Sequence, residues 1–121
     1  MTIAFIGYGN VGGALADRLQ RLGHEVALAA DDTASESLKT ALARNAAFRG
    51  APIRDAVRAA DVVFLATPFQ ANESILTRIA GDLAGKVLID CTNPVGPGLS
   101  HGLSGGRSGS AFVQSLVPDA R

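Results

Sequence analysis

The sequence predicts an α/β fold, in which helices cover both faces of a doubly wound, mostly parallel sheet. Short apolar runs alternate with amphipathic segments along the 121 residues, and crossover helices between parallel strands produce this alternation. The first run, Thr2–Ile6, leads directly into a glycine turn of the pattern G-x-G-x-x-G, which opens a helical stretch. A second run ends at Asp31, about 20 residues after the glycines. We therefore expect residues 1–121 to form a single domain of this class.

Each of the first four elements has its own local signal. Leucines recur at helical spacing after the glycine turn, and Gly23 lies where a glycine commonly ends a helix. Thr33 and Glu36 form the T-x-x-E pattern of a capping box, which predicts that a helix begins there. The expected elements are a strand over Thr2–Ile6, a helix over Val11–Leu22, a strand over Glu25–Ala30 and a helix from Thr33 to about Arg44.

The later elements follow from proline, apolar runs and glycine. Pro52 suits the first turn of a helix, and Asp61–Ala66 is the clearest buried strand. Residues 95–110 contain six glycines, which are costly to order, so we expect a mobile loop there. The other expected elements are a short strand near Ala47–Arg49, helices over Pro52–Ala60, Asn72–Leu83 and Ser110–Leu116, and a strand over Lys86–Asp90.

Composition and charge argue against several kinds of protein. The chain has 11 basic and 11 acidic residues, so no basic patch favours nucleic acid and no polybasic run favours a membrane. The apolar runs are too short to span a bilayer, and a strand beginning at Thr2 leaves no room for a signal peptide. The single cysteine, Cys91, cannot form an internal disulfide, which favours the cytoplasm. No Cys/His cluster has metal-ligand spacing, so we expect no metal.

The glycine turn is the strongest functional motif in the chain. In a dinucleotide-binding fold, the first glycine permits the tight turn, the second admits a pyrophosphate close to the backbone, and the third allows close packing of the helix. The helix N-terminus adds unpaired N–H groups and a partial positive charge, which suit a phosphate. The alternative is a glycine-rich turn with no ligand. The expected pyrophosphate-binding residues are Gly7, Tyr8, Gly9, Asn10, Val11 and Gly12.

Two aspartates follow the second strand. Asp31 is placed to accept a hydrogen bond from the adenosine ribose 2′-hydroxyl, and Asp32 beside it adds negative charge. Two carboxylates repel a 2′-phosphate, so local charge favours NAD over NADP. The alternative is that one or both residues begin the loop and cap the next helix, and for Asp32 this is the favoured interpretation.

The carboxyl ends of the later strands form the other side of the expected site, because open α/β sheets bind ligands there. Thr67 and Asn93 each precede a proline, Pro68 and Pro94, which holds them extended. Both could direct polar groups at a ribose or at the nicotinamide amide, and Phe69 could pack against a flat ring. The alternative is that these are ordinary turns that contain proline.

Three segments resemble the NADP oxidoreductases that depend on the deazaflavin coenzyme F420. They are IGYGNVGGALADRLQRLGHEV, ADVVFLATPF and KVLIDCTNP, within residues 2–94. The resemblance implies a Rossmann domain with a nucleotide across Gly7–Gly12, and with Thr67–Phe69 and Asn93–Pro94 beside the nicotinamide. It also implies hydride transfer between the nicotinamide and a deazaflavin or similar small acceptor. Such a transfer needs aligned rings more than an acid or base, and the sequence identifies no catalytic residue.

The chain departs from this family in two ways. Asp31 and Asp32 stand where the family usually has a small polar residue and an arginine for the 2′-phosphate, so the choice between NADP and NAD is open. Family members also continue beyond the end of this chain, and residues 117–121, VPDAR, resemble the lead-in to another strand. We therefore expect a domain truncated before that strand, with the acceptor site incomplete or supplied by a partner chain. An exposed sheet edge would favour a homodimer.

Two other functions compete with an oxidoreductase. A non-catalytic NAD(P)-binding or sensor domain is favoured by the short chain and the missing acceptor site. A methyltransferase also uses a glycine turn and a ribose-binding acid, but the helix that runs straight on from Gly12 fits a dinucleotide better.

Overall fold

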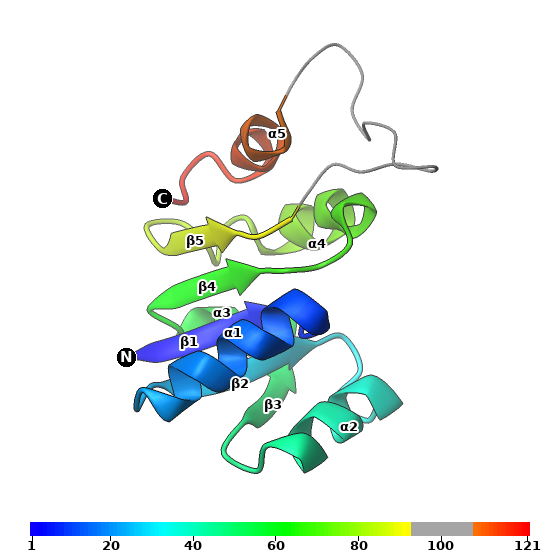
Figure 1. Ribbon diagram of the computed structural model, residues 1–121. Helices are drawn as coiled ribbons and strands as arrows, with labels where there is room; N and C mark the ends of the chain where they lie inside the picture. The colour runs from blue at the N-terminus through cyan, green and yellow to red at the C-terminus, as the bar shows by residue number, and fades with distance from the viewer. Residues whose placement is uncertain (93–107) are drawn as a thin grey trace.

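The sheet has five parallel strands in the order β3-β2-β1-β4-β5. The computed structural model describes residues 1–92 and 108–121 (Figure 1). The expected glycine-rich loop therefore lies almost wholly outside the described residues. The doubly wound α/β class is confirmed. The strands are β1 (Thr2–Ile6), β2 (Glu25–Ala30), β3 (Arg49–Pro52), β4 (Val62–Leu65) and β5 (Val87–Asp90).

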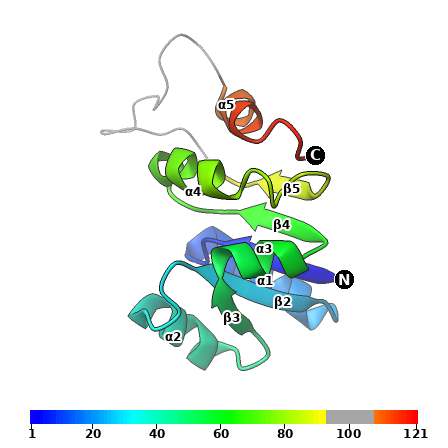
Figure 2. The same cartoon turned by 180° about the vertical axis from the view of Figure 1, so that it is seen from behind.

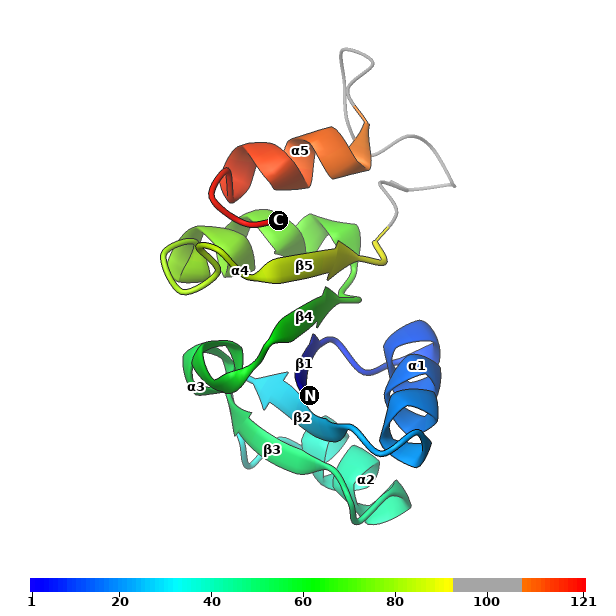
Figure 3. The same ribbon diagram turned by 90° about the vertical axis from the view of Figure 1, so that its left-hand side faces the viewer.

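Helices lie on both faces of this sheet, and Figure 3 shows α1 and α3 on opposite sides of the strands. One layer contains α1 (Asn10–Arg21) and α2 (Glu36–Arg44). The other contains α3 (Ile53–Ala59), α4 (Asn72–Ile79) and α5 (Gly109–Leu116), with the short 3-10 helix η1 (Phe69–Ala71) leading into α4. Figure 2, from behind, shows α3 in front of the strands. No helix in the described part of the chain is long and apolar enough to cross a membrane.

The alternation of side chains along β1 supplies two separate cores. Ala4 and Ile6 pack with the α3–α5 layer, whereas Ile3 and Phe5 pack with the α1–α2 layer. All four are buried because β1 lies at the centre of the sheet and is covered on both faces. The ring of Phe5 also stacks on that of Phe64 in β4, with centroids 4.7 Å apart. The glycine turn therefore begins from the central strand of the sheet, which is covered on both faces.

The start of α2 differs from the expected capping box. Thr33 is not the N-cap; Ser35 is, with extended backbone and a hydroxyl that accepts from the Leu38 N–H at 3.4 Å. The carboxylate of Asp32 accepts from the Ala34 N–H at 2.9 Å, which builds a turn through Thr33. The helix can begin only after this turn, so Glu36 is its first residue.

Three further boundaries differ from the expected ones. The strand expected near Ala47–Arg49 is instead Arg49–Pro52, because these residues pair with Ala27–Ala30 of β2. Pro52 ends this edge strand and is the N-cap of α3, so the helix begins one residue later than expected, and proline is tolerated on an edge strand. The α-helix α4 ends at Ile79 rather than Leu83, and a turn follows. By contrast, Gly23 has a φ of +96° and ends the α1 turn as expected.

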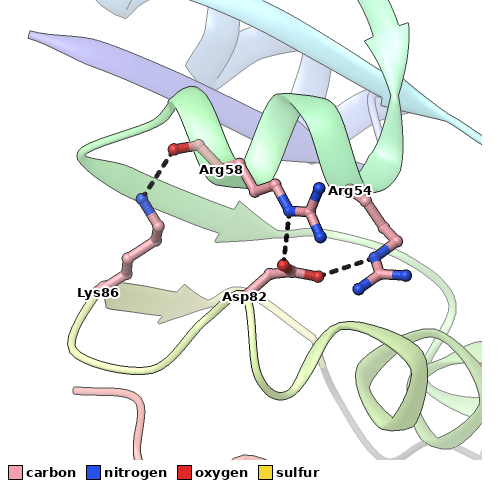
Figure 4. Close-up of polar contacts among 4 residues, drawn as sticks. All are labelled: Arg54, Arg58, Asp82 and Lys86. Carbon is pink, nitrogen blue, oxygen red and sulfur yellow. Dashed lines mark hydrogen bonds and ion pairs between the residues drawn. The ribbon is translucent and has the colours of Figure 1, made fainter.

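A polar network fastens α3 to the segment before β5, as Figure 4 shows. Arg54 and Arg58 each donate through Nε to one oxygen of Asp82, at 3.0 and 2.8 Å. Lys86 Nζ donates to the carbonyls of Arg58 and Ala60, at 3.2 and 2.6 Å, and so caps the end of α3. Hydrogen bonds lower the pKa of Asp82; the bond from Arg58 has the largest effect, and the bond from Arg54 has the next largest.

The last residue of the chain pairs with the outer edge of β5. The Arg121 N–H donates to the Lys86 carbonyl at 2.8 Å, and the Leu88 N–H donates to the Arg121 carbonyl at 2.7 Å. This is the pattern of a parallel bridge. That residues 117–121 lead into a further strand stays a prediction. The side chains of Val87 and Ile89 are exposed on this strand.

Candidate functional site

A cavity of about 920 Å³ lies at the carboxyl ends of β1, β2 and β4. Its walls come from the glycine turn, from Ala29–Asp31, from one side of α2 and from the β4–η1 connection. In a parallel sheet these ends meet at one edge, which is where open α/β folds bind ligands.

The glycine turn forms the floor of the cavity, and its glycines meet different constraints. Gly7 has a φ of +94°, and a Cβ there would lie 2.5 Å from the Ala66 carbonyl. A Cβ on Gly12 would collide with the Gly7 carbonyl oxygen. A Cβ on Gly9 would meet no protein atom within 4 Å. The fold itself therefore needs Gly7 and Gly12, whereas the open space at Gly9 is available to a ligand.

The N-terminus of α1 suits an anion. Gly9 is the N-cap, so no side chain caps the first turn, and that turn contains no acidic residue. Asn10 and Val11 of this turn line the cavity, and Val11 is 58% exposed although it is apolar. Uncapped N–H groups and the helix dipole both favour negative charge here. The turn thus fits the pyrophosphate of a dinucleotide, the group that the sequence predicts.

Asp31 lies at the expected position, but its carboxylate is already bound. Arg78 of α4 donates to both of its oxygens, at 2.9 and 3.3 Å. This bond raises the pKa of Arg78. Asp32 does not line the cavity, and it forms the turn before α2 described above. The two carboxylates therefore have different partners: Asp31 binds Arg78, whereas Asp32 binds the backbone of the turn before α2.

Thr67, Pro68 and Phe69 line the opposite wall. The Thr67 hydroxyl donates to Asn72 Oδ1 at 2.7 Å, so part of its hydrogen-bonding capacity is used inside the protein. Phe69 is buried and packs against Phe112 of α5, with centroids 5.6 Å apart. Asn93 and Pro94 lie outside the described residues.

A buried amide joins the ends of β4 and β5. Asn72 is 0% exposed; besides accepting from Thr67, its Nδ2 donates to Thr92 Oγ1 at 3.0 Å. The Thr92 hydroxyl in turn donates to Asp90 Oδ1 at 2.6 Å. This chain of bonds fixes the two loops at the cavity wall, and Thr92 lines the cavity beside Cys91. Burial, and then the charge of Asp90, raise the pKa of the Cys91 thiol.

The cavity brings together most of the predicted site residues that the structure describes. Those that line it are Gly7, Tyr8, Gly9, Asn10, Val11, Asp31, Thr67, Pro68 and Phe69. Gly12 packs beneath the turn instead. Within residues 1–92 and 108–121, no group of three or more His, Cys, Asp and Glu side chains could hold a metal ion.

Sequence reasoning missed one side of the cavity and two polar partners. Ser37, Thr40 and Arg44 of α2 line it, and the Tyr8 hydroxyl lies 3.5 Å from Ser37 Oγ. The spacing of these three residues places them on one helix face, which was a usable signal. No local pattern identifies Asn72 or Arg78, because their partners lie in other elements.

A family model described as NADP oxidoreductase, coenzyme F420-dependent, matches residues 2–94. An F420-dependent NADP reductase of Methanothermobacter thermautotrophicus is 38% identical over 102 residues, which cover 78% of this chain and 44% of that protein.

Two solved structures are similar over almost the whole chain. A candidate F420-dependent NADP reductase from Arthrobacter sp. FB24 has a TM-score of 0.88 at 30% identity, covering 99% of this chain and 60% of that one. A hypothetical protein from Sinorhizobium meliloti has a TM-score of 0.86 at 32% identity, covering 100% and 58%. The chain thus spans less than two thirds of each of these relatives.

Proposed function

The chain belongs to the coenzyme F420-dependent NADP oxidoreductase family, and on this basis we propose that it binds a nicotinamide dinucleotide for hydride transfer. The acceptor we propose is a small molecule of the deazaflavin class. The observation that carries the proposal is the open space at Gly9 above the uncapped N-terminus of α1. In the proposed role, the chain is the nucleotide-binding part of an oxidoreductase.

Each wall of the cavity has a task in this proposal. The turn around Gly9 holds the pyrophosphate, and the Asp31 end holds the adenosine ribose. Thr67–Phe69, with Thr92, borders the nicotinamide. When bound there, the nicotinamide would supply or take up the hydride.

The chain's own contribution to the reaction is alignment. The Thr67–Asn72–Thr92 bonds fix the wall beside the nicotinamide, and the apolar Phe69 and Ile75 exclude water from it. Positioning two rings face to face is the main requirement of hydride transfer. We assign no general acid or base.

A cytoplasmic location stays our proposal, because the single cysteine, Cys91, is free.

The second candidate is a domain that binds NAD(P) without catalysis. This candidate is favoured because the chain matches less than two thirds of the length of its relatives. Oxidation of NADPH by a deazaflavin acceptor at a rate above the buffer rate would decide for the oxidoreductase. Binding without turnover would decide for the second candidate.

The first experiment is a side-by-side titration of the 121-residue chain with NADH and NADPH, followed by nicotinamide fluorescence. We expect saturable binding of at least one of them. Gly9→Val should abolish binding, because its side chain would occupy the space where the pyrophosphate approaches the backbone. It should leave the circular dichroism spectrum unchanged, because that space contains no protein atom.

Gly81→Val is the matched control. A Cβ on Gly81 also meets no protein atom within 4 Å, and Gly81 does not line the cavity. It should bind like the wild type. Unchanged affinity in Gly9→Val would contradict the assignment of the pyrophosphate to this turn.

A further inference from the structure

The Asp31–Arg78 ion pair spans one end of the candidate site. Asp31 follows β2 and Arg78 lies on α4, so the pair joins two elements that are 47 residues apart in the chain. The two terminal nitrogens of the Arg78 guanidinium, Nη1 and Nη2, donate to Oδ1 and Oδ2 of Asp31, at 2.9 and 3.3 Å. The positive charge of Arg78 therefore offsets the carboxylate that would otherwise repel a phosphate on the ribose.

Room for such a phosphate exists on the Arg78 side. A second cavity of about 480 Å³ lies between the end of β2 and the α3–α4 layer, and Asp31 lines both cavities. Arg78, Arg54 and Asp55 line the second one. Asp31 is thus at the boundary between the predicted ribose position and a space lined by Arg54, Arg78 and the acidic Asp55.

Arg78 is the guanidinium that already lies beside the predicted ribose position, because it binds Asp31. Arg54 is held by Asp82, whose side chain is only 10% exposed. Arg44, on the opposite wall, lies 3.6 Å from Asp17. The side chains of the Asp31–Arg78 pair are 64% and 51% exposed, so water screens their attraction and the pair contributes little to stability. A guanidinium can leave such a carboxylate for a phosphate at small cost.

We propose that Arg78 determines the specificity of this site at the ribose 2′ position, by leaving Asp31 to bind the 2′-phosphate of NADP while its positive charge stays beside the carboxylate. This inference rests on the proposed function. It explains how a site with the acidic Asp31 after β2 would accept the 2′-phosphate of NADP, the nucleotide named in the family description. The Nε of Arg78 also donates to the Ser74 carbonyl at 3.3 Å, within the same helix, and this leaves Nη1 and Nη2 to bind the acid partner. A guanidinium can bind two phosphate oxygens at once.

The test compares two adenosine nucleotides that differ only in the phosphate concerned, adenosine 2′,5′-bisphosphate and adenosine 5′-monophosphate. Calorimetric titration of the full chain should show tighter binding of the bisphosphate. In Arg78→Gln, its affinity should fall by about tenfold or more, the usual effect of losing a charged hydrogen bond. The affinity for the monophosphate should change by less than about threefold, because Arg78 does not touch the 5′-phosphate in this assignment.

Two further variants complete the design. Asp31→Asn should tighten binding of the bisphosphate, since it releases Arg78 and removes the repelling charge. Arg58→Gln removes an exposed guanidinium of the neighbouring helix that is bound to Asp82 and does not line either cavity. It should bind both nucleotides like the wild type.

The failures of the two proposals can be separated. If the wild type binds the monophosphate and Arg78→Gln weakens both nucleotides equally, or neither, the role of Arg78 is overturned while the nucleotide site stands. If the wild type binds neither nucleotide nor NADH nor NADPH, both proposals are overturned.

Discussion

At the scale of single residues, the glycine turn contains two glycines that the fold requires and one that leaves space for a ligand. Gly7 is fixed by its positive φ and by the Ala66 carbonyl, and Gly12 by its contact with the turn. These two positions would be constrained even in a protein that binds nothing. Gly9 is different, because the space beside it is open. The middle glycine is therefore the position of the motif that the fold leaves available to a ligand.

Cys91 gives a residue-scale prediction about reactivity. Burial and the adjacent Asp90 charge raise the pKa of its thiol, so at any given pH the thiolate fraction is smaller than for an ordinary cysteine. We expect alkylation by iodoacetamide to be slow at neutral pH and to accelerate as the pH rises toward the raised pKa. The reference is the same cysteine in the urea-unfolded chain, which should react faster at neutral pH. An equal or faster rate in the folded protein would contradict the prediction.

At the scale of elements, the sequence specified which segments form strands and helices better than where they begin. Periodicity and glycine signals correctly predicted β1 and β2, because their apolar runs are buried on both faces. Capping signals were ambiguous before α2, since Thr33 and Ser35 are both good caps. The Asp32 turn selects Ser35. Likewise, β3 is placed by its pairing with β2, which no local pattern contains.

The candidate site shows the same division. The glycine turn and Asp31 were found because the motif is continuous in sequence. Asn72 and Arg78 were missed because each acquires its role from a residue at the end of another strand. Sequence spacing predicts a side chain's own element, whereas long-range partners depend on the order of strands in the sheet.

Asn72 is the link between elements whose removal should be most damaging. Asn72→Leu would leave the hydroxyls of Thr67 and Thr92 without their buried partner. We expect the free energy of unfolding to fall by about 1–3 kcal/mol, measured by urea denaturation. Thr77→Val, on the same helix, removes an exposed hydroxyl that donates to the Glu73 carbonyl. It should cost less than about 0.5 kcal/mol. Equal effects of the two changes would show that the Asn72 network does not hold the loops.

The Asp82 network gives a pH-dependent prediction. Bonds from Arg58 and Arg54 lower the pKa of Asp82 below its ordinary value. Its ionised form therefore stabilises the fold above the unfolded-state pKa of about 3.9, and this stabilisation is lost as the pH falls through the lowered pKa. Asp82→Asn should be less stable than wild type at pH 7, and the difference should shrink in acid.

The control for Asp82 is Asp119→Asn, at an exposed aspartate outside the network. Thermal unfolding between neutral and acid pH gives both profiles. Asp119→Asn should follow the wild type throughout. Parallel profiles for Asp82→Asn and wild type would mean that the carboxylate is not held by the arginines in solution.

At the scale of the whole molecule, the order of strands determines both the site and the exposed surface. The reversal between β2 and β4 around β1 opens the cavity at the centre of the sheet. On the α1–α2 side, those two helices contact β1, β2 and β3. The side chains of Val87 and Ile89 in β5 face that side, because the alternate residue, Leu88, packs against the opposite core. Two large apolar side chains are therefore exposed beside the half-buried Phe64.

Such a surface favours self-association, so we predict that the isolated chain forms a homodimer through the exposed face of β5. Light scattering at increasing protein concentration should show a mass approaching twice 12.4 kDa. Ile89→Lys should return the mass to that of the monomer, because a charge at the centre of the face would lose its water on association. Leu22→Lys is the control, since Leu22 is 63% exposed at the far end of α1 and lies outside this face. Its mass should match the wild type. A monomeric mass for the wild type at the highest concentration would contradict the predicted homodimer.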